Sequence, residues 1–201
     1  MEAANFSHAV DIIKENQGGT YEKTIAWIAI FAALLGLTAC GSAGEAHTYT
    51  GTMTELVDSI YNNCPQKPEF SLGETTAIDT SDANALKSFL GLTDGSQVEE
   101  AVYSEPMMSS QAYSLCALRV AEDADAKDIA QQVLDGVDPR KWICVEADQV
   151  RVGVWGDVIV LAMVSSSLSD TLADDIMTAF SETTGGELDL ILKKMSKGRR
   201  L

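Results

Sequence analysis

Two apolar segments flank a tight turn in the stretch Val150-Arg151-Val152-Gly153-Val154-Trp155-Gly156-Asp157-Val158-Ile159-Val160-Leu161-Ala162-Met163-Val164. Valine and isoleucine dominate both segments, and β-branched side chains pack well on a pleated strand. Gly156-Asp157 suits a two-residue turn, because glycine adopts positive φ without a steric penalty. The stretch therefore predicts two antiparallel strands, residues 150–155 and 158–164, joined as a hairpin.

Further strands are predicted on the N-terminal side of the hairpin. The clearest is residues 113–120, where side chains alternate between two faces, as they do along a strand. One face carries Ser114, Cys116, Leu118 and Val120, and the other carries Tyr113, Leu115, Ala117 and Arg119. Residues 98–103 also alternate, residues 142–145 are strand-like, and residues 70–78 are expected to form a loop or a weak strand.

Four segments show the apolar spacing of helices that bury one side. They are residues 53–61, 80–90, 123–134 and 169–180. Their ends carry residues typical of helix caps: Thr52 or Thr54, Ser81 or Asp82, and Ser169 at the starts, and Gly91 after the second helix.

This mixture of hairpins and helices predicts the α+β class: an antiparallel sheet with helices packed on it. We expect a single small domain over residues 53–185. Residues 186–201 are expected to be a basic C-terminal tail, with a short helix at most and otherwise loose.

The 201-residue chain is strongly acidic, with a net charge of −16 at pH 7, and 46% of its residues are hydrophobic. That hydrophobic fraction is ordinary for a globular domain. Residues 193–200 carry five positive charges and residues 1–23 carry a net −2, so residues 24–192 carry −19. Such a body repels phosphate groups, and we therefore expect no nucleic-acid partner.

An unbroken apolar run covers residues 25–35, and Gly36 and Leu37 extend it. A membrane-spanning helix needs about 20 apolar residues, so this run is short for a span and suits the core of a signal peptide. A short membrane helix or an uncleaved core helix is the alternative. The segment that follows, Leu37-Thr38-Ala39-Cys40-Gly41-Ser42, resembles the bacterial lipobox.

The lipobox resemblance implies that the Cys40 thiol takes a diacylglyceryl group and that a signal peptidase, recognising Leu37, Thr38 and Ala39, cuts before Cys40. Residues 1–39 would then be an N-terminal extension and lipoprotein signal peptide, and residues 40–52 the lipidated cysteine and a tether. Two acyl chains suffice for stable membrane residence. The resemblance thus implies a domain anchored to the outer, extracytoplasmic face of the cell membrane.

A second resemblance covers about residues 98–182. The segment Val102-Tyr103-Ser104-Glu105-Pro106-Met107-Met108-Ser109-Ser110, followed by an alternating strand, a helix and the hairpin, is similar to the bacterial lipoprotein family called domain of unknown function 4358 (DUF 4358). That family often continues with Thr-Asn-Ala, where this chain has Ser110-Gln111-Ala112. Its members occur mainly in Gram-positive Firmicutes, usually behind a lipobox. The resemblance implies a fold and a location, and no activity.

The residues expected to fold contain few groups suited to catalysis. The two histidines, His8 and His47, both precede residue 53, which removes the usual general base and histidine metal ligands from the domain. Phosphate-binding glycine loops and the Gly-x-Ser-x-Gly motif are absent from the sequence. We therefore expect that the protein is not an enzyme and that it binds no cofactor and no metal ion.

Acidic and cysteine residues leave narrower alternatives open. The pairs Glu99-Glu100 and Asp174-Asp175 are expected to be solvated, although a catalytic pair is the alternative. Glu122, Asp123 and Asp125 either favour a helix start or gather a weak cation. Cys116 and Cys144 are expected to be core thiols, with a bridge between them as the alternative, and Cys64 is the expected exposed thiol.

Residues 106–111 are the candidate partner-binding segment. Pro106 lacks an amide donor and should lie at a strand end, and Ser109 and Ser110 suit a turn. Met107 and Met108 could form an adaptable apolar surface, although filling the core is the alternative.

Together these features predict a non-enzymatic module that binds an envelope protein or a cell-wall component. The second candidate is a small-ligand-binding lipoprotein serving a transporter. A deep apolar pocket would favour the second, and a filled core with an exposed patch would favour the first.

Overall fold

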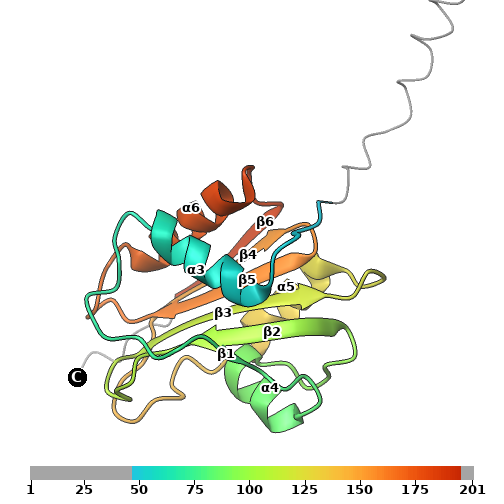
Figure 1. Ribbon diagram of the computed structural model, residues 1–201. Helices are drawn as coiled ribbons and strands as arrows, with labels where there is room; N and C mark the ends of the chain where they lie inside the picture. Colours follow the sequence, from blue (N-terminus) through green and yellow to red (C-terminus); the bar gives the residue numbers. More distant parts are fainter. Residues whose placement is uncertain (1–46, 196–201) are drawn as a thin grey trace, which may run out of the picture. The chain divides into compact units, whose positions relative to one another are not determined.

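The computed structural model describes residues 47–195, which fold around one antiparallel six-stranded sheet (Figure 1). The strands are β1 Thr76–Ala77, β2 Val98–Ser104, β3 Tyr113–Val120, β4 Gln149–Trp155, β5 Val158–Val164 and β6 Leu190–Met195, in the order β1-β2-β3-β5-β4-β6. The helices are α3 Met53–Asn63, α4 Ala83–Leu90, α5 Ala126–Gly136 and α6 Leu172–Thr184. This architecture confirms the predicted α+β class.

The predicted hairpin lies at the centre of the sheet. Gly156 has a φ of 55° in the turn, and Trp155 pairs with Val158. Strand β5 pairs with β3 on its other side and is buried along its whole length. Its uniformly apolar sequence matches a strand that is covered on both faces.

Helices cover both faces of the sheet, and each face has its own core (Figure 1). Helices α4 and α5 cover the face that carries Cys116, Leu118 and Val120 of β3. Helices α3 and α6 cover the opposite face, which carries Tyr113, Leu115 and Ala117. The alternation predicted for this strand is therefore confirmed.

Local capping explains where the helices begin and end. Thr52 and Glu55 form a reciprocal capping box at α3, Asp82 caps α4, and Gly91 ends α4 in the left-handed conformation. At α6 the predicted cap is displaced. Thr171 occupies the N-cap position, while the Ser169 hydroxyl accepts the amide hydrogens of Thr171 and Leu172.

Two predictions about secondary structure are wrong. Residues 142–145 form a loop and no strand, and Cys144 has a φ of 66° there. Residues 190–195, expected to belong to a loose tail, form β6 and pair with β4. Leu190 and Leu192 pack against the α4–α5 core, which holds β6 in place despite its basic character. The domain therefore extends beyond residue 185, to at least Met195.

Within residues 47–195, no helix combines the length and apolar character that crossing a membrane requires. Leu37, Thr38, Ala39 and Cys40 lie outside the described residues.

Candidate functional site

The strand register gives the sheet two different ends. At one end lies the β4–β5 turn, residues 155–158, which we call the linker end. At the other end Val164 pairs with Tyr113 and Gln149, and Gln149 pairs with Met195. There the β2–β3 loop, residues 105–112, and the α5–β4 loop, residues 137–148, leave the sheet. We call this the loop end.

At the linker end, Arg119 holds the segment that enters the domain. Its Nη1 donates to the Tyr49 carbonyl at 2.6 Å, and its Nη2 donates to the Gly51 carbonyl at 2.5 Å. The same guanidinium forms an ion pair of 2.7 Å with Asp157, whose other carboxylate oxygen accepts the Tyr49 amide at 2.8 Å. Both partners of the ion pair are largely buried, so water competes weakly with these bonds.

The β4–β5 turn also contacts the segment of residues 47–51. The rings of His47 and Trp155 stack with centroids 4.9 Å apart, and the Asp157 amide donates to the His47 carbonyl at 3.2 Å. A Cβ on Gly156 would lie 1.8 Å from that carbonyl, so only glycine allows this approach. Residues 47–51, which belong to the predicted tether, are therefore held against the domain by Arg119, Asp157 and the β4–β5 turn.

The loop end exposes large apolar side chains. Met107 is 78% exposed, Met108 is 64% exposed, and Ile143, in the neighbouring loop, is 78% exposed. Ser109 and Ser110 are also exposed. The predicted surface turn at residues 106–111 is therefore confirmed, and Met107 and Met108 do not fill the core.

The two loops at this end are joined and held by polar contacts. Lys141 and Glu105 form an ion pair of 2.5 Å between them. Pro106 forms an isolated bridge with Leu72, and the Met107 amide donates to the Ser71 carbonyl at 3.3 Å. These contacts hold in place the loops that carry the exposed apolar side chains. We call Met107, Met108 and Ile143 the apolar surface.

Sequence reasoning missed Ile143, because residues 142–145 have the composition of a strand. The left-handed backbone of Cys144 turns the chain there and leaves Ile143 and Cys144 exposed. The expectation for the cysteines is therefore wrong in two places: Cys144 is exposed, and Cys64 is buried. No pair of Cys64, Cys116 and Cys144 forms a bridge.

Three polar side chains, Lys141, Ser114 and Cys116, lie close enough together to be considered as a catalytic group. Lys141 Nζ lies 3.4 Å from the Ser114 hydroxyl, which lies 3.6 Å from the Cys116 sulfur. However, the Lys141 ammonium is paired with Glu105, and Ser114 and Cys116 are completely buried. Burial also raises the pKa of the Cys116 thiol to about 11, so the thiol stays protonated and is a poor nucleophile at neutral pH. The cluster serves packing.

Two of the acidic residues that the sequence singled out, Asp125 and Glu100, have structural roles. Asp125 caps α5 by accepting the amides of Lys127 and Asp128, and Glu100 accepts the Met53 amide at 3.0 Å. Within residues 47–195, no three histidine, cysteine or carboxylate side chains are grouped so that they could hold a metal ion.

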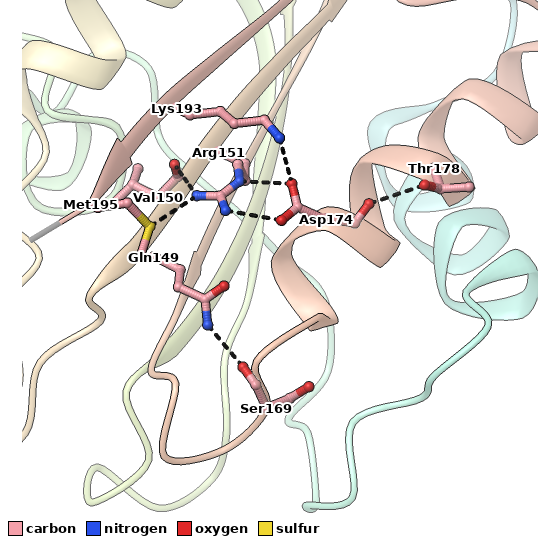
Figure 2. Close-up of polar contacts among 8 residues, drawn as sticks. All are labelled: Gln149, Val150, Arg151, Ser169, Asp174, Thr178, Lys193 and Met195. Carbon is pink, nitrogen blue, oxygen red and sulfur yellow. Dashed lines mark hydrogen bonds and ion pairs between the residues drawn. The ribbon is translucent and has the colours of Figure 1, made fainter.

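Asp174 belongs to a charged network that joins α6 to the sheet (Figure 2). Arg151 on β4 is buried and donates to both Asp174 carboxylate oxygens at 2.9 Å, and Lys193 on β6 reaches the same carboxylate at 2.9 Å. These donors, above all the Arg151 guanidinium, lower the pKa of Asp174 from 3.8 to about 2.

The Asp174 network predicts a stability that depends on pH. Because the pKa of this carboxyl is lower in the folded chain than in the unfolded chain, its contribution is present above about pH 5 and is lost as the pH falls towards about 2. We expect the Asp174 network to contribute about 1 kcal/mol to the free energy of unfolding, since the carboxylate is half-exposed and water screens the ion pair. Urea denaturation between pH 2 and 7 should show a flatter profile for Asp174→Asn than for the unchanged chain. Parallel profiles for Asp174→Asn and the unchanged chain would contradict the assignment.

The structure also shows where a ligand could lie. A groove between α6 and β6 has a volume of about 740 Å³, and it is open and of mixed character, with Met177, Leu188 and Ile191 beside Glu182 and Glu187. Both faces of the sheet are filled by buried side chains. The described residues therefore combine filled cores with an exposed apolar surface at the loop end.

Comparisons of the chain with protein-family models, curated proteins and solved structures found no match. The similarity of residues 98–182 to the DUF 4358 family therefore stays a prediction.

Proposed function

We propose that the protein is a lipoprotein anchored to the outer face of the cell membrane through Cys40, and that its domain is a non-enzymatic binding module. The apolar surface at the loop end recognises a protein of the cell envelope. The resemblance of residues 37–42 to the lipobox and the apolar run before them support the anchor, and the predicted similarity to DUF 4358 lipoproteins of Gram-positive Firmicutes would imply the same location.

The observation that carries the proposal is the placement of the apolar surface. Met107, Met108 and Ile143 lie at the end of the sheet opposite the end where Arg119 holds residues 47–51. Residues 47–51 therefore leave this surface uncovered. Large exposed apolar side chains on two joined loops are typical of protein-binding surfaces, and methionine adapts its shape to an uneven partner.

For the same binding module, a cell-wall component is the alternative to an envelope protein. A small ligand delivered to a transporter is the second candidate function. A small ligand would enter the open groove between α6 and β6, but the mixed lining of this groove is less apolar than that of most small-ligand sites. The envelope-protein proposal is favoured because its surface is apolar and exposed.

The proposal predicts that polar substitution in the apolar surface removes the partner without unfolding the domain. We expect Met107→Gln combined with Met108→Gln to reduce partner recovery from detergent-solubilised membranes by at least about tenfold, which corresponds to about 1.4 kcal/mol. Exposed substitutions usually change stability by less than about 0.5 kcal/mol, so the melting temperature should be nearly unchanged.

The matched control is Met107→Leu with Met108→Leu, which keeps the apolar character and should keep the partner. Binding to purified cell-wall material, measured by co-sedimentation, separates a cell-wall ligand from an envelope protein. Equal partner recovery by the glutamine and leucine variants would contradict the proposed surface, and unfolding of the glutamine variant would show that the segment is structural.

A further inference from the structure

Strand β6 forms one edge of the sheet and pairs with β4 alone. Among residues 47–195, nothing pairs with its outer edge. Two large apolar side chains on this strand are exposed: Ile191 at 43% and Met195 at 60%. An exposed edge strand with apolar side chains is a template for pairing with another strand.

Lysine side chains often protect such edges from pairing, but here both lysines are directed onto their own domain. Lys193 forms an ion pair with Asp174, and Lys194 donates to the Leu134 carbonyl at 3.2 Å (Figure 2 shows Lys193). Since both ammonium groups are held against neighbouring elements, the backbone edge of β6 is left accessible.

The sequence along this edge is complementary to itself. In Asp189-Leu190-Ile191-Leu192-Lys193, an acidic residue precedes the apolar centre and a basic residue follows it at the same spacing. Antiparallel pairing of two copies about Ile191 places Ile191 opposite Ile191, Leu190 opposite Leu192, and Asp189 opposite Lys193. Directly opposite side chains lie on the same face of a sheet, so the apolar pairs can make contact. Asp189 and Lys193 would also face each other, although each has a partner in its own copy: Asp189 accepts the Gly156 amide at 2.6 Å, and Lys193 pairs with Asp174.

Other registers are less favourable. Centring the pair on Lys193 places two ammonium groups opposite each other, which destabilises a strand pair. Centring it on Leu192 places Ile191 opposite Lys193 and leaves Asp189 opposite Met195. The register about Ile191 alone among these three matches apolar with apolar and opposite charges with each other.

We propose that β6 pairs antiparallel with β6 of a second copy of this chain, in the register centred on Ile191, and joins two sheets into one. The contact is isologous, because the same strand contributes on both sides, and such two-fold interfaces are the commonest in soluble oligomers. The proposal does not depend on the function proposed for the loop end.

The symmetry has a consequence for an anchored chain. The two-fold axis is perpendicular to the sheet, since only that rotation reverses a strand while keeping its faces. The two linker ends therefore lie at opposite ends of the joined sheet, and the two apolar surfaces also point in opposite directions.

Cysteine cross-linking tests the register directly. The full chain carries Cys144→Ser to remove the exposed thiol, and this background sets the baseline. In the proposed register, the Cβ atoms of two opposite residues at position 191 lie about 5 Å apart. Two copies of residue 193 are separated by four residues along the strand, which is roughly 13 Å. A disulfide needs Cβ atoms about 4 Å apart, so only the first pair lies within reach.

We expect mild oxidation in membranes to convert Ile191→Cys into a disulfide-linked dimer at least about tenfold more than Lys193→Cys. Co-expression of Asp189→Cys with Lys193→Cys should also yield a cross-linked dimer. Equal cross-linking at positions 191 and 193, cross-linking to a different protein, or none above the baseline would overturn the proposal.

Sedimentation in detergent gives an independent measurement. Lys193→Asp opposes two acidic residues and should raise the dimer dissociation constant by at least about tenfold, which is about 1.4 kcal/mol. The double variant Asp189→Lys with Lys193→Asp exchanges the charges and should restore dimerisation, provided its circular dichroism spectrum matches that of the unchanged chain. A chain that sediments as a monomer at every concentration would overturn the proposal even if partner binding at the loop end were intact.

Discussion

Replacement of Cys40 by alanine should abolish lipidation of the protein and cleavage before residue 40. The thiol is the group to which the diacylglyceryl chains would be attached, and these two acyl chains are what would anchor the mature domain to a bilayer. We expect Cys40→Ala to take up no labelled fatty acid and to accumulate as an uncleaved precursor. Fractionation and intact-mass spectrometry of the membrane protein measure both effects.

Cys144→Ala is the matched control, because it also removes a cysteine but should leave lipidation unchanged. The decisive observation is the mass of the unchanged protein. If mature chains retain Ala39 and carry no lipid, the anchor proposed here is absent, and the apolar run would need another role, such as a short membrane helix.

Replacement of Gly91 by alanine should cause a large loss of stability. Gly91 ends α4 with a φ of 71°, and an added Cβ would lie 2.3 Å from the Gly136 carbonyl carbon and the Val137 nitrogen. Left-handed backbone costs a non-glycine residue about 1–2 kcal/mol, and overpacking adds about 1–3 kcal/mol. We expect Gly91→Ala to lower the free energy of unfolding by about 3 kcal/mol, measured by urea denaturation.

Gly185→Ala separates the two contributions to that loss. Gly185 ends α6 with a φ of 76°, but nothing lies within 4 Å of the position its Cβ would occupy. The substitution should therefore carry the backbone cost alone, about 1 kcal/mol. Equal losses for the two variants would show that the close approach of α4 and α5 at Gly91 contributes little.

The central part of the fold could be predicted because its signals are local. The turn at Gly156 and Asp157 depends on adjacent residues, and the caps at Asp82 and Gly91 lie within or beside the helix they limit. The alternation along β3 likewise needs only one strand to be recognised. These features place the sheet, the four helices and the exposed turn at Met107 and Met108.

Strand β6 and the loop containing Ile143 could not be predicted from such local signals. Residues 190–195 are short and carry two lysines, and they form a strand only because β4 offers an edge and the α4–α5 core accepts Leu190 and Leu192. Residues 142–145 have strand-forming composition, but Cys144 adopts a left-handed backbone there, and the segment pairs with no strand.

The sequence by itself determined the fold class, the hairpin, the helix caps at Asp82 and Gly91, a turn at residues 106–111 and the expectation of a lipid anchor, because each rests on residues close together in the chain. Only the tertiary structure decided which segments meet. Arg119 reaches the Tyr49 carbonyl across 70 positions, and Lys141 reaches Glu105 across 36. The free energy of such contacts depends on the whole packed sheet, because the fold must first bring the partners together and exclude water from them.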